Sequence, residues 1–166
     1  MFNSGSSPYV KNSGRLADVI AAIQAMGVYE FHMCEFNIWA ERISGSASKA
    51  DYWKRVFEEH PEFFRLDTTR MMASLVWRRQ LPKDYHVDLK RRLLLEEQNA
   101  LPQAGYQRLT RAPLAAPDIK ALIDTAVNLH ARAVELQREG RWWVPLISNF
   151  VSGVVGGLIV VFFKHG

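Results

Sequence analysis

The apolar C-terminal run is the feature that most constrains this chain. No side chain between Trp142 and Phe163 is ionisable. At about 1.5 Å per residue this run forms a helix of roughly 33 Å, and a bilayer hydrocarbon core measures about 30 Å. Trp142 and Trp143 precede the run and Lys164 follows it, as interfacial residues do. We therefore expect one transmembrane helix over residues 142–163, with a buried core helix as the alternative.

The charges around this run predict an orientation. Arg132, Arg138 and Arg141 lie before it, whereas Lys164 alone follows it. Because positive residues favour the cytoplasmic side, we expect a single-pass protein of the bacterial inner membrane with a cytoplasmic N-terminal domain. The single cysteine, Cys34, cannot form an internal disulfide and is expected to be a free buried thiol.

Small and polar residues occupy one side of the predicted membrane helix. They form two rows at helical spacing, and one of these rows contains a GxxxG motif. Small residues let two helix backbones approach closely, while serine and asparagine hydrogen-bond between helices. We expect self-association through Ser148, Asn149, Ser152, Gly153, Gly156 and Gly157.

The N-terminal half reads as a small domain. Residues 1–14 are rich in Gly, Ser and Asn and are expected to be flexible. Apolar periodicity predicts helices over Arg15–Met26, about Phe31–Ile43 and about Ser48–His60, the first stopped by Gly27 and the last by Pro61. Two runs rich in β-formers, 63–66 and 73–78, flank a turn and predict a hairpin.

This order of elements over Arg15–Gln80 resembles the winged helix-turn-helix superfamily. The resemblance implies a fold that is mainly α, with a small α+β winged-helix-like domain over residues 15–80, a long C-terminal helix and the transmembrane helix. It also implies nucleic-acid or protein contacts through the third helix and the hairpin. The basic candidates for these contacts are Lys49, Lys54, Arg55, Arg65, Arg70, Arg78 and Arg79.

The middle of the chain changes character. Residues 81–117 are expected to hold a short helix at Val87–Gln98 and a Pro- and Gly-containing linker, and 118–141 a long amphipathic helix. That long helix has an apolar stripe at heptad spacing, which either forms a coiled coil or packs on the N-terminal domain. The heptad stripe consists of Ile119, Leu122, Ala126, Leu129, Ala133 and Leu136.

The sequence offers no catalytic or metal-binding motif. His32, Cys34 and Glu35 lie close together, but no second ligand pair has finger-like spacing. Residues 1–80 carry ten Lys/Arg against nine Asp/Glu, and residues 81–141 carry ten against eight, so no polybasic segment stands out. We expect a protein that is not an enzyme and needs no cofactor or metal.

Three functions fit these features. The small size, the lack of enzyme motifs and the small-residue anchor are similar to the transmembrane effectors of bacterial anti-phage defence systems. That resemblance implies a soluble domain that senses a protein or nucleic-acid trigger, and a helix that self-associates in the lipid bilayer and perturbs it. The alternatives are a membrane-tethered nucleic-acid-binding regulator and a passive membrane adaptor that recruits a protein partner.

Overall fold

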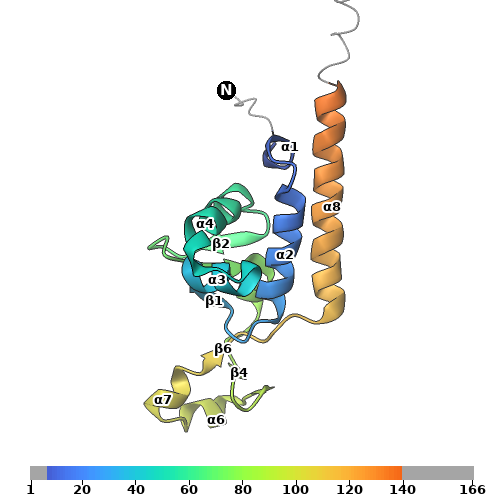
Figure 1. Ribbon diagram of the computed structural model, residues 1–166. Coiled ribbons are helices and arrows are strands. Elements are labelled where there is room, and N and C mark those ends of the chain that lie inside the picture. Colours follow the sequence, from blue (N-terminus) through green and yellow to red (C-terminus); the bar gives the residue numbers. More distant parts are fainter. Residues whose placement is uncertain (1–6, 140–166) are drawn as a thin grey trace, which may run out of the picture.

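The computed structural model describes residues 7–139, which are mainly helical and contain two small antiparallel sheets. The first sheet and its helices form the main body, and the longest helix runs along one side of it (Figure 1). A smaller second sheet projects from the end of the main body near the start of that long helix.

The predicted membrane anchor is corrected by this structure. Within residues 7–139 no helix is both long enough and apolar enough to span a bilayer. The longest one, α8 (Ala116–Glu139), carries charged side chains such as Lys120, Asp124 and Arg132 along its length, and charges inside a bilayer are costly. The transmembrane helix in the predicted fold class is therefore wrong, as are the single-pass localisation in the inner membrane and the three membrane-based functions. The predicted span at 142–163, including its small and polar rows, lies outside the described residues.

The main body combines three helices with a three-stranded sheet. The strand order is β1-β3-β2, with Cys34 opposite Ala73 and Ala73 opposite Leu66. In chain order, the elements are α2 (Arg15–Val28), β1 (Met33–Glu35), α3 (Phe36–Ser44), the 3-10 turn η1 (Ala47–Lys49), α4 (Ala50–Glu59), β2 (Phe64–Leu66) and β3 (Met72–Leu75).

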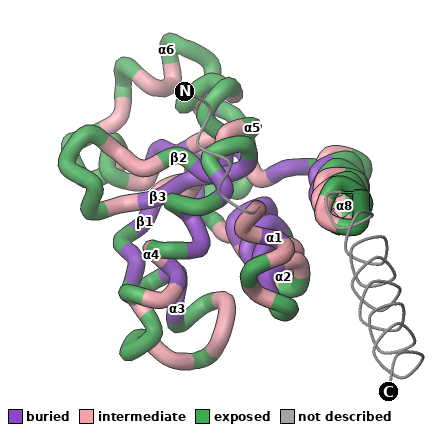
Figure 2. The backbone as a smooth tube through the Cα atoms, turned by 90° about the horizontal axis from the view of Figure 1, so that it is seen from above, coloured by how far each residue is buried: buried purple, intermediate pink, exposed green. Residues whose placement is uncertain are grey.

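The core lies between these helices and one face of the sheet. Each helix contributes the apolar side chains that recur at helical spacing, such as Ile23 of α2, Trp39 of α3 and Phe57 of α4, all fully buried. The indole N–H of Trp39 donates to the backbone carbonyl of Ala73 at 2.9 Å, which joins α3 to the central strand. Most buried positions in Figure 2 accordingly lie in the main body, whereas the region around α6 is largely exposed.

The region after β3 differs from its prediction. The predicted helix at Val87–Gln98 is confirmed only in its last part, where residues Leu95–Asn99 are helical. Its first half instead forms a turn, in which Lys90 adopts a positive φ of 51°, and a two-residue strand. The second sheet has the order β5-β4-β6. The segments are α5 (Val76–Gln80), β4 (Tyr85–His86), β5 (Arg91–Arg92), α6 (Leu95–Asn99), α7 (Gln103–Tyr106) and β6 (Leu109–Thr110).

The long helix α8 packs on the main body, with its first half against α2 and with contacts to the short helix α1 (Pro8–Lys11). Leu122 and Ala126 of the heptad stripe are buried in the core, and Ile119, Leu129 and Ala133 pack against it. The last stripe residue, Leu136, is 67% exposed. The stripe therefore packs within the chain, which was the alternative to a coiled coil.

The N-terminal segment is more ordered than its composition predicts. Tyr9 of α1 is buried, and its ring lies 4.5 Å from that of His60 and 5.7 Å from that of His130, measured between centroids. Residues 8–11 are therefore part of the fold, and only residues 1–6 of the predicted flexible segment lie outside the described residues.

Candidate nucleic-acid interface

The seven predicted contact cations fall into three places. Lys49, Lys54 and Arg55 lie on α4 or just before it, and Arg70 lies in the β2–β3 turn; we call these four the α4–hairpin cations. Arg65 of β2 and Arg79 of α5 are both exposed and line one shallow hollow with Pro61, Val76 and Gln80; we call them the outer-sheet pair. Arg78 is fully buried, which excludes it from any external contact.

Arg78 is a structural residue rather than a binding residue. Its guanidinium donates hydrogen bonds of 2.6–3.3 Å to main-chain carbonyls only. Two of these carbonyls lie at or just past the carboxyl end of α2, where exposed carbonyls favour a positive charge. Burial lowers the pKa of Arg78 to about 10, so the side chain remains charged at neutral pH. The acceptors are the carbonyls of Met26, Tyr29, Glu30, Arg111 and Ala112.

The outward side of α4 is more basic than its sequence indicates. Glu59 forms an ion pair with Arg15 of α2 at 2.9 Å, and Glu58 forms one with Arg70 at 2.5 Å. Both carboxylates at the end of α4 are thus neutralised by partners from other elements. Lys49 and Arg55 remain exposed, and no ion pair engages either of them within residues 7–139.

Lys54 is partly buried. Its ammonium lies 5.6 Å from the centre of the Phe36 ring, a cation–π distance, so its aliphatic part covers α3 while its charge stays near the surface. Lys54 therefore flanks the outward row of α4, which consists of Asp51, Arg55 and Glu58.

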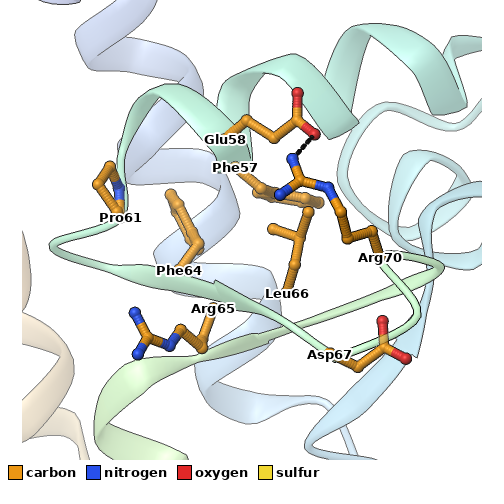
Figure 3. Close-up of a pocket in the computed structure, with 8 residues that line it drawn as sticks. All are labelled: Phe57, Glu58, Pro61, Phe64, Arg65, Leu66, Asp67 and Arg70. Carbon is orange, nitrogen blue, oxygen red and sulfur yellow. Dashed lines mark hydrogen bonds and ion pairs between the residues drawn. The ribbon is translucent and has the colours of Figure 1, made fainter.

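The β2–β3 turn is held by one carboxylate. Asp67 accepts hydrogen bonds from the backbone N–H groups of Met71 and Met72 at 2.9 and 2.8 Å, and another from the hydroxyl of Thr69. The Thr69 hydroxyl and these N–H groups lower the pKa of Asp67 to about 2. Arg70 adopts a positive φ of 56° in this turn, and this backbone position directs its side chain towards Glu58 of α4 (Figure 3).

A groove separates α4 from β2. Its volume is about 270 Å³, and Phe57, Phe64 and Leu66 supply its apolar surface. The ion pair between Glu58 and Arg70 lies over Phe57 and Leu66, while Arg65 points to the other side of β2 (Figure 3). Arg65 thus lines both the groove and the hollow beside Arg79, while its guanidinium lies on the opposite side of β2 from the side chains of Phe64 and Leu66.

A cluster of titratable groups that the sequence did not single out lies on the α1 side of the main body. His60 is buried, and its Nδ1 lies 2.9 Å from a carboxylate oxygen of Glu62, which also accepts the Tyr9 hydroxyl at 3.4 Å. Burial and the neighbouring Glu62 raise the pKa of Tyr9 above its usual range. Within residues 7–139 no group of three or more His, Cys, Asp or Glu side chains has metal-site geometry.

Cys34 is buried on β1, and burial raises the pKa of its thiol to about 11. The neighbouring His32 turns instead towards β6, where its Nδ1 lies 2.9 Å from the Thr110 hydroxyl. His32 and Cys34, which lie close together in the sequence, therefore do not converge on one ligand.

Comparisons with protein families, curated proteins and solved structures gave no match to this chain. The functional argument therefore rests on the geometry of the site.

Proposed function

We propose that residues 15–80 form a winged-helix module that binds the phosphate backbone of duplex nucleic acid through α4 and the β2–β3 turn, and that the protein is not an enzyme. The order of helices and strands supports this proposal. In such modules the last helix and the hairpin approach the nucleic acid together. The β1-β3-β2 sheet with α2, α3 and α4 matches that arrangement.

One observation carries the proposal: the ion pair between Arg70 and Glu58. It holds the tip of the hairpin against the outward side of α4, so the two elements present one continuous surface. It also removes the carboxylate that would repel a phosphate next to Arg55. With Glu59 engaged by Arg15, Asp51 is the only acidic side chain of α4 outside an ion pair among the described residues.

The surface is suited to phosphate contacts rather than to base recognition. Its charge comes from long basic side chains, and the aromatic side chains Trp53 and Phe57 of α4 are buried and cannot stack on bases. Phosphate contacts position a protein on a duplex without reading its sequence. We therefore expect binding that depends strongly on salt and weakly on sequence.

The test measures binding of the full chain to a short fluorescent duplex by anisotropy, between about 50 and 200 mM salt. Each phosphate contact contributes about 0.9 to the slope of log K against log salt. Because Arg70 is paired with Glu58, the three other α4–hairpin cations predict a slope of about −2 to −3. Replacing Lys49→Glu and Arg55→Glu together is expected to weaken binding at least about tenfold and to lower the slope by about 2.

The matched control is Arg132→Glu with Arg138→Glu, which makes the same charge change at two exposed positions of α8, away from α4. This control is expected to change binding far less than the variant at positions 49 and 55. If the wild-type chain fails to bind duplex at the lowest salt, or if the α8 variant weakens binding as much as the α4 variant, the proposal is wrong.

A further inference from the structure

β2 is an edge strand with main-chain groups directed away from its sheet. Val76 N–H donates to the carbonyl of Phe63, and Asp67 N–H donates to the carbonyl of Met72. In an antiparallel pair such bonds alternate along each strand. The main-chain N–H and C=O groups of residues 63, 65 and 67 therefore point towards β3, and those of residues 64 and 66 point to the open side. The Phe64 N–H donates to the backbone carbonyl of His60. The carbonyl of Phe64 and both main-chain groups of Leu66 therefore remain at the edge.

No other strand among the described residues covers that side of β2, because the sheet order is β1-β3-β2. Three main-chain groups in a row can therefore bond to an added strand. An extended peptide that joins a sheet in this way takes its affinity from main-chain bonds and its specificity from alternate side chains.

The two faces of β2 have different chemistry. On the helix side, the groove of about 270 Å³ exposes part of Leu66 above the buried rings of Phe57 and Phe64. On the opposite side, Arg65 and Arg79 share a hollow that no carboxylate lines. Figure 3 shows Arg65 directed away from the groove that contains Phe64 and Leu66.

We propose that the β2 edge binds an extended segment of a partner protein in which an acidic residue stands between two apolar ones. Successive side chains of a strand point to opposite faces. In the register that places the apolar side chains next to Phe64 and Leu66, the acidic side chain lies beside Arg65 and Arg79. The apolar groove thus matches the two apolar side chains of such a peptide, and the positive charges of the outer-sheet pair match its acidic side chain.

The peptide and duplex surfaces meet at the ion pair between Arg70 and Glu58, which lines the groove, but their other charged residues differ. Lys49 and Arg55 line neither the groove nor the hollow beside Arg79. Substitutions at positions 49 and 55 therefore test duplex binding, and substitutions at positions 65 and 79 test peptide binding.

The test uses the full chain and three blocked, fluorescent peptides of equal length, with the central sequences Val-Glu-Val, Glu-Val-Glu and Val-Lys-Val. Fluorescence anisotropy reports binding. The first peptide is expected to bind best, because the second puts carboxylates into the apolar groove and the third places a like charge next to Arg65. N-methylation of the central main-chain nitrogens should abolish binding of the first peptide, because it removes the donors to the β2 edge.

Variants locate the interaction on the protein. Arg65→Glu with Arg79→Glu should weaken the Val-Glu-Val peptide about fivefold or more and strengthen the Val-Lys-Val peptide, since each cross-strand charge pair changes sign. Lys49→Glu with Arg55→Glu is the matched control, because it makes the same charge change outside the groove and the hollow, and it should leave the affinities of both peptides unchanged. Both sites are exposed, so circular dichroism is expected to show that each variant is folded.

Three results would overturn the proposal. The first is equal binding of Val-Glu-Val and Glu-Val-Glu, or no binding of either. The second is unchanged affinities in the Arg65 and Arg79 variant. The third is that short duplex displaces the peptide and that the Arg65 and Arg79 variant loses affinity for duplex and for peptide to the same extent. That result would assign this edge to nucleic acid.

Discussion

Arg78 makes more side-chain hydrogen bonds than any other residue between 7 and 139. Its charge is balanced by carbonyl dipoles rather than by a carboxylate, and the carbonyls belong to residues 26–30 at the end of α2 and to residues 111–112 after β6. One side chain thus joins α5 to two segments that are distant in the sequence.

Replacing Arg78→Met is expected to lower the free energy of unfolding by about 3–5 kcal/mol, because it leaves five carbonyls without this donor. Arg78→Lys should be intermediate, since it keeps the charge but has fewer donors in a different geometry. Urea unfolding followed by circular dichroism measures both. The matched control is the neighbouring exposed residue, Arg79→Met, which should change stability by less than about 0.5 kcal/mol. Equal losses at positions 78 and 79 would contradict this role.

At the scale of elements, the contact between α2 and α8 depends on close approach. A side chain at Gly27 would meet the Ile119 side chain at 3.0 Å, so the glycine lets α8 begin against the end of α2. The carbonyl of Gly27 also accepts the N–H of Leu114 at 2.9 Å, just before α8. Gly27 therefore lies inside α2, which continues to Val28, rather than stopping the helix at Gly27 as predicted.

The heptad stripe of α8 gives a test at this scale. Leu122 is 3% exposed and Leu136 is 67% exposed. Leu122→Ala is expected to destabilise the fold by about 2–4 kcal/mol, because it leaves a cavity between α8 and α2. Leu136→Ala should be neutral within about 0.5 kcal/mol. Chemical denaturation at two protein concentrations separates the alternatives, since a coiled coil between copies would make both losses similar and dependent on concentration.

Several elements follow from local patterns. The apolar periodicity predicted α2, α4 and α8 close to their observed bounds, because each buries one face on a neighbour. The hairpin was also predicted, although its second strand ends at Leu75 and residues 76–80 turn into α5. The short strand β1 and the second sheet were missed. Each of these strands has only two or three residues and is defined by distant partners, so no alternation is long enough to reveal it.

At the scale of the whole molecule, the second sheet is joined to the main body by polar and cation–π contacts. His32 is one of the connecting residues. Its backbone N–H donates to the hydroxyl oxygen of Thr110 at 3.1 Å, which leaves the hydroxyl proton free to be donated to Nδ1 of His32. A neutral imidazole that carries its proton on Nε2 accepts this hydroxyl proton at Nδ1. Beside it, the guanidinium of Arg108 lies over the Phe31 ring at 5.1 Å.

The neutral state of His32 predicts a pH dependence of stability. Burial, with the nearby positive charges of Arg111 and Arg78, lowers the pKa of His32 from 6.5 to about 4. The unfolded chain therefore binds the proton first as pH falls. Stability is lost between about pH 6.5 and pH 4, by at most about 3 kcal/mol for this residue, and is regained when the pH rises.

The measurement compares urea unfolding of the wild type and His32→Asn from about pH 7 to about pH 4.5. The asparagine side chain keeps an oxygen that can accept from the Thr110 hydroxyl, but it does not titrate. The stability of the His32→Asn protein should therefore fall less steeply in this pH window. All other side chains are the same in the two proteins, so the comparison isolates the contribution of position 32. Parallel curves for the two proteins would exclude His32 as the source.

The candidate site was only partly predictable. Residue type and position were enough to propose seven cations, but they did not distinguish Arg78 from Arg79, one buried and one exposed. The two differ in environment because α5 is a short helix whose Arg78 side faces the end of α2. Likewise, the ion pairs of Glu58 and Glu59 depend on partners 12 or more positions away, so the net charge of α4 could not be read from its own sequence.

Arg78 also has a consequence for how this chain can vary. All five of its acceptors are main-chain oxygens, which every amino acid supplies. Substitutions at Met26, Tyr29, Glu30, Arg111 or Ala112 leave those oxygens in place, and none of them can compensate for the loss of the guanidinium. The junction of three segments is therefore encoded by a single codon, without a co-varying side chain elsewhere to reveal it.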